Sequence, residues 1–256
     1  ELLFEKGDIV LIESPSYFVY SDTLATQGVE FITIETDEYG LIPSHLESIF
    51  LELESEGRLE QLKMLYTIPW CQNPSGSSRS ISRLKELEQL LSRWVLKSQF
   101  LILEDAAYRS LCFNPENVSS TLLQYPSLKD HVAYATTFSK PFAPGVKLGA
   151  GILPRHLFNK LTLLKGYHDF GTSNWNQAVL WQLLKHRWLH AAKDRVLHNY
   201  QVKARILYDK LSEELGENFT FFMPSGGMYL WVKCPDYLDT SRGSELFKNC
   251  LEEGVL

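Results

Sequence analysis

Short runs of β-branched and aliphatic residues alternate with longer segments of helical period over the first two thirds of the chain. This alternation is typical of a parallel sheet whose strands are joined by crossover helices. The strand candidates are residues 9–13, 31–35, 64–68, 100–104, 132–136 and 148–153. The pattern therefore predicts an α/β fold on a mostly parallel sheet.

One of the helical segments is plainly amphipathic. Ile81, Leu84, Leu87, Leu91 and Trp94 recur at steps of three and four residues, which places them on one face of a helix. We expect that face to cover one side of the sheet.

The last third of the chain has a different pattern. Residues 176–214 are helical almost without a break, with room for a kink, which favours a connector between two domains. Strands are predicted at 219–223 and 228–233 around a turn at 224–227, followed by a helix at 244–253. We interpret 1–185 as a large domain and 186–256 as the start of a smaller α+β domain.

Composition and charge narrow the class of protein. The chain has 256 residues, 45% of them hydrophobic, which is enough to bury a substantial core. The formal net charge is −6 and the basic residues are scattered, so no nucleic-acid-binding surface is predicted. No apolar run approaches the roughly 18 residues of a membrane span. Small molecules are the expected partners.

The cysteines and the two ends of the sequence add two further expectations. Cys71, Cys112, Cys234 and Cys250 lie far apart without paired spacing. Neither a metal site nor a disulfide framework is predicted, and a reducing, cytoplasmic location is expected. The sequence opens without methionine and stops after a helical stretch, so we interpret it as an excerpt of a longer protein.

Polar side chains follow four of the predicted strands, where ligands of an open parallel sheet bind. Taken singly, each has a plain structural explanation as a turn, a helix cap, a solvated lysine or a packed aromatic ring. The succession of four such strand ends favours one shared site. The residues in question are Tyr17, Asn73, Asp105, Tyr108, Thr137, Ser139 and Lys140.

These segments resemble motifs of the fold-type-I, pyridoxal-phosphate-dependent aminotransferases of class I/II. The run from Thr137 to Gly149, with Lys140, resembles the cofactor-lysine signature of that family. Further family motifs are similar to four other segments of this chain: 73–76 (Asn-Pro-Ser-Gly), 105–108, 13–17 and 226–231. The resemblance covers nearly the whole chain and is nearest to the branch of 2-aminoadipate, kynurenine and aromatic aminotransferases.

The resemblance implies a role for each residue. Lys140 would form an aldimine with pyridoxal 5′-phosphate and move the substrate's α-proton, and Asp105 would keep the ring nitrogen protonated. The remaining roles are hydrogen bonds to the ring oxygen from Asn73 and Tyr108, stacking on the ring by Tyr17, and phosphate binding by Thr137, Ser139 and Lys147. Amino-acid and 2-oxo-acid substrates, a homodimer, and cis bonds at Ser14-Pro15 and Asn73-Pro74 are also implied.

Lys147 departs from the family pattern, which has arginine at this position. A lysine cannot form the bidentate fork of a guanidinium, so phosphate affinity is expected to be lower. The family's glycine-rich phosphate loop and the arginine for the substrate carboxylate would lie outside this sequence.

Transamination is the leading functional hypothesis, and three others remain open at this stage. A lyase or synthase of the same fold would share every motif quoted. A cofactor-binding effector domain of a transcription regulator would keep Lys140 but sense ligands without turnover. Coincidental matches in a nucleotide-binding α/β protein are disfavoured, because no glycine-rich loop follows a predicted strand.

Overall fold

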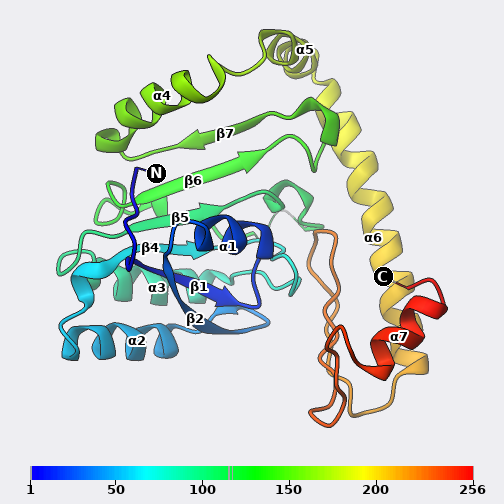
Figure 1. Ribbon diagram of the computed structural model, residues 1–256. Coiled ribbons are helices and arrows are strands. Elements are labelled where there is room, and N and C mark those ends of the chain that lie inside the picture. Colours follow the sequence, from blue (N-terminus) through cyan, green and yellow to red (C-terminus); the bar gives the residue numbers. More distant parts are fainter. Residues whose placement is uncertain (1, 115, 117, 256) are drawn as a thin grey trace.

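The computed structural model describes residues 2–114, 116 and 118–255, and within them the chain forms one seven-stranded sheet (Figure 1). The strand order is β3-β2-β1-β4-β5-β6-β7. The strands are β1 (Ile9–Ser14), β2 (Glu30–Asp37), β3 (Gly40–Leu41), β4 (Leu62–Thr67), β5 (Leu101–Asp105), β6 (Val132–Thr137) and β7 (Gly149–Ile152). All neighbours pair in parallel except β3 and β7 at the two edges, which are antiparallel. The predicted α/β fold and its mostly parallel sheet are confirmed.

Helices cover both faces of this sheet. The helices of the chain are α1 (Phe18–Ala25), α2 (Pro43–Ser55), α3 (Ile81–Trp94), α4 (Arg155–Asp169), α5 (Asn174–Lys185), α6 (Trp188–Glu214) and α7 (Glu245–Glu252), and α1, α2 and α3 pack on the faces of the sheet. Successive side chains of a strand point to opposite faces. Ile9 and Leu11 of β1 accordingly pack with α2 and α3, whereas Val10 and Ile12 pack on the side of α1. Burial on both faces explains why the strands are almost continuously apolar.

Helix α3 has the bounds that its apolar spacing predicts. The Ser80 hydroxyl caps it by accepting the Arg83 backbone N–H at 3.1 Å. Leu84, Leu87 and Trp94 are buried as expected, but Ile81 in the first turn is 55% exposed.

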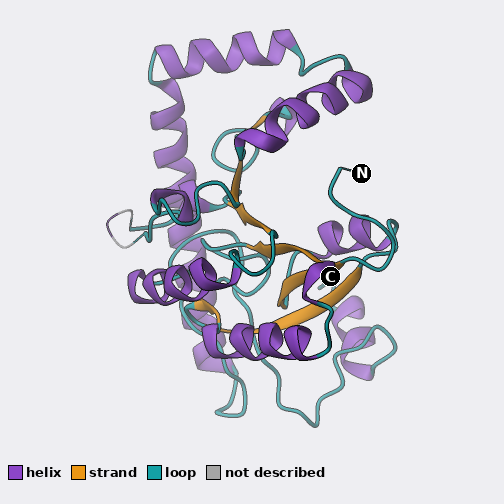
Figure 2. Ribbon diagram, turned by 90° about the vertical axis from the view of Figure 1, so that its left-hand side faces the viewer, coloured by secondary structure: helices purple, strands orange, loops and turns teal. Residues whose placement is uncertain are grey.

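The long helical segment of the last third is two helices. α5 ends before His186, and Arg187 adopts a left-handed backbone (φ 58°) before α6 begins. No described side chain of α6 is buried. Figure 1 shows α6 on the side toward which β1 and β6 point, and Figure 2 shows it as the long vertical helix beside the twisted sheet. None of the described helices is long and apolar enough to cross a membrane.

The two strands predicted at 219–223 and 228–233 do not form regular strands, which corrects the sequence interpretation. The two segments share one isolated bridge, between Thr220 and Lys233. The turn between them bonds elsewhere: the Phe113 N–H donates to the Ser225 carbonyl at 2.8 Å, and the Gly227 N–H donates to the Leu111 carbonyl at 3.1 Å. These bonds hold the turn against the loop after β5, and the residues on its two sides do not pair as a regular hairpin. The terminal helix is confirmed as α7, capped by Ser244.

Candidate functional site

The loops after β4, β5 and β6 bring four of the predicted site residues together. Asn73 follows β4, Asp105 and Tyr108 lie at and after the end of β5, and Lys140 follows β6. The Lys140 Nζ lies 5.4 Å from the centre of the Tyr108 ring. Parallel pairing of β4, β5 and β6 puts their carboxyl ends at one edge of the sheet, which accounts for the meeting of these side chains.

Asp105 is a partly buried carboxylate with neutral hydrogen-bond donors. The Tyr66 hydroxyl donates to Oδ2 at 2.8 Å and the Ala107 N–H donates to Oδ1 at 3.0 Å. Burial raises the pKa of Asp105, and these two hydrogen bonds and the charge of Lys140 oppose that rise. A cation within hydrogen-bond distance would therefore stabilise the charged form of Asp105.

Asn73 and Tyr108 form a small polar group with a residue that the sequence interpretation did not single out, Tyr229. The Asn73 amide donates to the Tyr108 hydroxyl at 3.4 Å, and the hydroxyls of Tyr108 and Tyr229 are 3.2 Å apart. Burial raises the pKa of Tyr108, so its phenol keeps its proton and can donate. The only sequence signal for Tyr229 was its place in the segment 226–231.

Gln72 joins the loop after β1 to the loop after β4. Its amide nitrogen donates to the Pro15 carbonyl at 2.6 Å and to the Glu13 carboxylate at 3.2 Å, while its amide oxygen accepts the Ser75 N–H at 2.7 Å. Glu13 is 3% exposed, and burial raises its pKa. This network, which the sequence interpretation missed, fixes the backbone on both sides of Asn73. The Ser14-Pro15 and Asn73-Pro74 bonds are cis, as predicted.

Tyr17 lies at the start of α1, just beyond the end of β1. Its ring packs against the apolar cluster on the α1 face of the sheet, which includes Val10 and Ile12. Its centroid is 6.1 Å from that of Phe18. The position at a strand end is as expected, and stacking on a cofactor ring stays a prediction.

Thr137 and Ser139 shape the loop that carries Lys140. The Thr137 hydroxyl donates to the Leu148 carbonyl at 3.2 Å and accepts the Ser139 N–H at 3.1 Å. Lys147 has a left-handed backbone (φ 47°) between buried Val146 and Leu148. Its side chain is exposed and forms no hydrogen bond or ion pair within the described part of the chain. It is free to meet a ligand.

A cavity of about 300 Å³ opens beside Lys140. Its walls are the loop after β6, the face of α6 that carries Asn199, Tyr200 and Lys203, and Met228 from the segment after the long helix. No sequence motif pointed to these α6 residues. Their position beside Lys140 depends on the break between α5 and α6. The described residues contain no cluster of three or more His, Cys, Asp or Glu side chains that could hold a metal ion.

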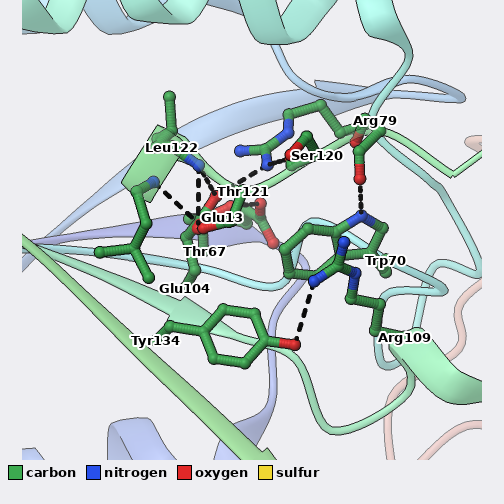
Figure 3. Close-up of polar contacts among 12 residues, drawn as sticks. Glu13, Thr67, Trp70, Arg79, Glu104, Arg109, Ser120, Thr121, Leu122 and Tyr134 are labelled. Atoms are coloured by element: carbon green, nitrogen blue, oxygen red, sulfur yellow. Dashed lines mark hydrogen bonds and ion pairs between the residues drawn. The ribbon is translucent and has the colours of Figure 1, made fainter. Parts of the chain in front are cut away.

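A buried ion pair supports the strand end from which Asp105 projects (Figure 3). The Arg79 Nη2 lies 2.7 Å from the Glu104 carboxylate and 2.8 Å from the Ser120 carbonyl. Glu104 also accepts hydrogen bonds from the Thr121 hydroxyl and from the Leu122 N–H at 3.1 Å. Figure 3 shows this network beside Trp70, whose indole N–H donates to the Ser119 carbonyl at 2.9 Å.

Replacing Arg79 by alanine is expected to destabilise the protein by about 3–5 kcal/mol, because the Glu104 charge would stay buried without its partner. Denaturant unfolding measures the loss. Arg93→Ala is the matched control, since its ion pair with Glu47 is exposed and is expected to contribute less than about 1 kcal/mol. Equal losses in the two variants would contradict the assignment of a buried, dependent charge.

Comparison with known proteins identifies the family. The family described as aminotransferase class I and II matches residues 1–256. The chain is 30% identical over 239 residues to aromatic-amino-acid aminotransferase 1 of Thermococcus litoralis, a match that covers 93% of this chain and 55% of that protein. It is also 27% identical to an uncharacterized HTH-type transcriptional regulator of Bacillus subtilis, over 99% of this chain and 49% of that protein.

A solved structure agrees with the sequence matches. The crystal structure of an α-aminoadipate aminotransferase from Thermus thermophilus, complexed with N-(5′-phosphopyridoxyl)-L-leucine, superposes with a TM-score of 0.84 at 28% identity. The match covers 99% of this chain and 62% of that one. The chain thus spans between about half and three fifths of the length of these relatives. Because the family match extends over all of residues 1–256, the chain belongs to the class I and II aminotransferase family.

Proposed function

We propose that the full-length protein is a pyridoxal-phosphate-dependent aminotransferase that moves an amino group from an L-amino acid to a 2-oxo acid. The observation that carries the proposal is the meeting of Lys140, Asp105, Tyr108 and Asn73 at one edge of the sheet, in a chain of the aminotransferase family. Names of relatives support the same branch, since they include aromatic-amino-acid and α-aminoadipate aminotransferases.

The residues present fit the cofactor. Asp105 has two neutral donors, and a carboxylate can accept further hydrogen bonds, so it has capacity left for a cationic ring nitrogen. Lys140 borders the 300 Å³ cavity and forms no salt bridge with any described acid. Asn73 and Tyr108 supply donors suited to a ring oxygen. These features suit the ring nitrogen, the ring oxygen and the carbonyl carbon of pyridoxal.

Each of these side chains has a proposed task. When bound, pyridoxal phosphate supplies an electron sink for the charge left when a proton leaves the α-carbon of the amino acid. Asp105 holds the proton on the ring nitrogen, while Asn73 and Tyr108 orient the ring by donating to its oxygen. The Lys140 amine would hold the cofactor and would carry the proton of the substrate's α-carbon. Tyr17 packs on the ring face.

The phosphate is proposed to bind at Thr137, Ser139 and Lys147. Lys147 carries the charge, and the hydroxyls of Thr137 and Ser139 stand at the start of the same loop. We expect Lys147→Ala to weaken pyridoxal phosphate binding by about 1.5–3 kcal/mol, the scale of a hydrogen bond to a charged group. Lys147→Arg is expected to bind equally or more tightly.

Fluorescence titration of cofactor-stripped protein measures these affinities. Lys160→Ala, which removes an exposed lysine from α4, is the matched control and is expected to bind like the wild type. An alanine variant at position 147 with unchanged affinity would place Lys147 outside the phosphate site.

A second candidate function rests on the likeness to the Bacillus subtilis transcriptional regulator. A sensor domain of this kind would bind the cofactor and an amino acid and would not turn over. Visible spectra recorded while amino acids and then 2-oxo acids are added separate the cases. Recovery of the starting spectrum with formation of a new amino acid supports transamination, release of ammonia or a thiol indicates a lyase, and a spectral change without product indicates a sensor.

We also propose a homodimer in the cytoplasm, with residues 1–185 and 186–256 in different domains. Large aromatic side chains exposed on α4, α5 and α6 support association with a second copy, because monomers rarely expose so many together. Phe170 and Trp175 are 98% and 76% exposed. Light scattering of the full-length protein tests the dimer.

The four cysteines are free, which supports the proposed location in a reducing compartment.

A further inference from the structure

Two cysteines far apart in the sequence meet beside the proposed site. The Cys71 and Cys112 sulfurs are 3.2 Å apart, and both residues are buried. Cys71 belongs to the loop after β4, two residues before Asn73, and Cys112 follows Tyr108 by four residues in the loop after β5. The other two cysteines, Cys234 and Cys250, are half-buried.

The backbone around the pair places the two sulfurs with little freedom. Cys71 has a left-handed backbone (φ 49°), which is uncommon outside glycine. Gly226 forms a bridge with Cys112, and a Cβ at Gly226 would lie 2.5 Å from the Cys112 Cα and 2.7 Å from the Cys71 sulfur. A Cβ at Gly227 would lie 2.7 Å from the Cys71 Cβ. Only glycines at these positions let the turn pack over both thiols.

The two thiols are not equivalent. Cys112 borders a cavity of about 120 Å³, which Cys71 does not reach. The pKa of Cys112 is lowered by its hydrogen bond with Cys71, and the nearby charge of Arg109 acts in the same direction against burial. The pKa of Cys71 is raised by that contact and by burial. Cys112 therefore has space for a co-reactant beside it and is the more readily deprotonated thiol of the two.

We propose that Cys71 and Cys112 are a redox-sensitive pair that a small hydroperoxide converts to a disulfide, and that this bond displaces the loops carrying Asn73 and Tyr108. Hydrogen peroxide is the size of about two water molecules, each of about 30 Å³, so the cavity beside Cys112 can hold it. The first half of the inference concerns the sulfurs alone. The second half rests on the proposed function of the two loops.

Peroxide would form the disulfide in two steps. The Cys112 thiolate attacks one peroxide oxygen, the O–O bond breaks, and the other oxygen leaves and takes a proton to become water, which leaves a sulfenic acid on Cys112. The Cys71 thiol then loses its proton, its sulfur attacks that of Cys112, and the S–O bond breaks to release a second water. Two thiols lose two electrons and two protons, and one peroxide is reduced to two waters.

Bond formation requires the sulfurs to approach from 3.2 Å to the disulfide length of about 2.05 Å. In the proposal, the loops after β4 and β5 and the glycine turn over them share this movement of more than 1 Å, because the backbone around the pair leaves the two sulfurs little freedom. Tyr229, which contacts Tyr108, follows that turn by two residues. The reaction at the sulfurs therefore acts on the group formed by Asn73, Tyr108 and Tyr229.

The test treats the reduced full-length protein with a small excess of hydrogen peroxide, blocks free thiols, and maps peptides without reduction. We expect one cross-linked pair, Cys71 with Cys112, two mass units below the sum of its peptides, and blocked thiols at Cys234 and Cys250. In Cys71→Ser, Cys112 should stop as a sulfenic acid that dimedone traps. Cys234→Ser is the control and should cross-link like the wild type. Absence of the Cys71–Cys112 peptide, or earlier oxidation of Cys234 and Cys250, overturns the inference.

A second readout tests the effect on the site. Oxidation is expected to lower transamination by about 10- to 100-fold, the scale of a 1 Å misplacement in an active site, and a dithiol should restore it. The transamination rates of Cys71→Ala and Cys112→Ala should not fall on peroxide treatment, because neither variant can form the cross-link. A cross-linked protein with full activity overturns the proposed displacement of the loops. The cross-link is measured without substrate. The test of the thiol pair therefore remains valid even if the protein proves not to be an aminotransferase.

Discussion

Replacing Lys140 by alanine is expected to abolish transamination by the full-length protein while leaving its fold unchanged. The side chain lies in a loop, touches no charged partner among the described residues, and borders a cavity, so its loss removes chemistry and little packing. Turnover should fall to the background of the assay. The visible absorbance of the bound cofactor should change with it, because the covalent link to the protein is gone.

Circular dichroism and thermal unfolding of the cofactor-free proteins provide the control for Lys140→Ala. We expect the two melting temperatures to be similar, since Lys140 forms no salt bridge with a described acid and the Thr137 hydroxyl holds its loop independently of the lysine side chain. Turnover at the wild-type rate would remove Lys140 from the proposed mechanism.

Asp105→Asn has the second-largest expected effect, a loss of turnover of about 10²- to 10³-fold with a much smaller loss of cofactor affinity. An amide can still reach the ring nitrogen, but it carries no charge to keep a proton there. Steady-state kinetics and a cofactor titration measure the two quantities separately. Equal turnover in the two proteins would reduce Asp105 to a structural role at the end of β5.

The same substitution has a second expected effect, on the stability of the cofactor-free protein. Burial raises the pKa of Asp105 in the folded state above its ordinary value of 3.8. The folded protein therefore binds more protons than the unfolded chain in the window above that value, and stability falls as pH rises through the folded pKa. Asp105→Asn should be more stable than the wild type at pH 7, and the difference should vanish in acid. Parallel pH profiles of unfolding would contradict this.

The sheet could be predicted from the sequence because its signal is local. β-Branched and aliphatic runs indicated six of the strands to within a few residues, and the strand ends carried Asp105 and Lys140 to one edge. The two-residue strand β3 had no pattern of its own. The spacing of leucines in α3 matched its bounds, since burial of one face and a serine cap determine them.

The sequence pattern did not predict interactions between segments that are distant along the chain. The segment at 219–233 alternates like a hairpin, but its turn pairs with Cys112, so tertiary contacts override the local preference. Gln72 and Tyr229 act through partners far away along the chain, Pro15 and Tyr108. A polar residue inside an apolar stretch, as Glu13 is at the end of β1, was the one signal that could have pointed to such a network.

Transfer of labelled nitrogen tests the proposed transamination most directly. The full-length protein, loaded with pyridoxal phosphate, is incubated with a panel of ¹⁵N-labelled L-amino acids and unlabelled 2-oxo acids, and the products are analysed by mass spectrometry. We expect ¹⁵N in the amino acid derived from the added oxo acid, and none in Lys140→Ala. Label released as ammonia, or a spectral change of the bound cofactor with no labelled product from any pair, would contradict the proposal.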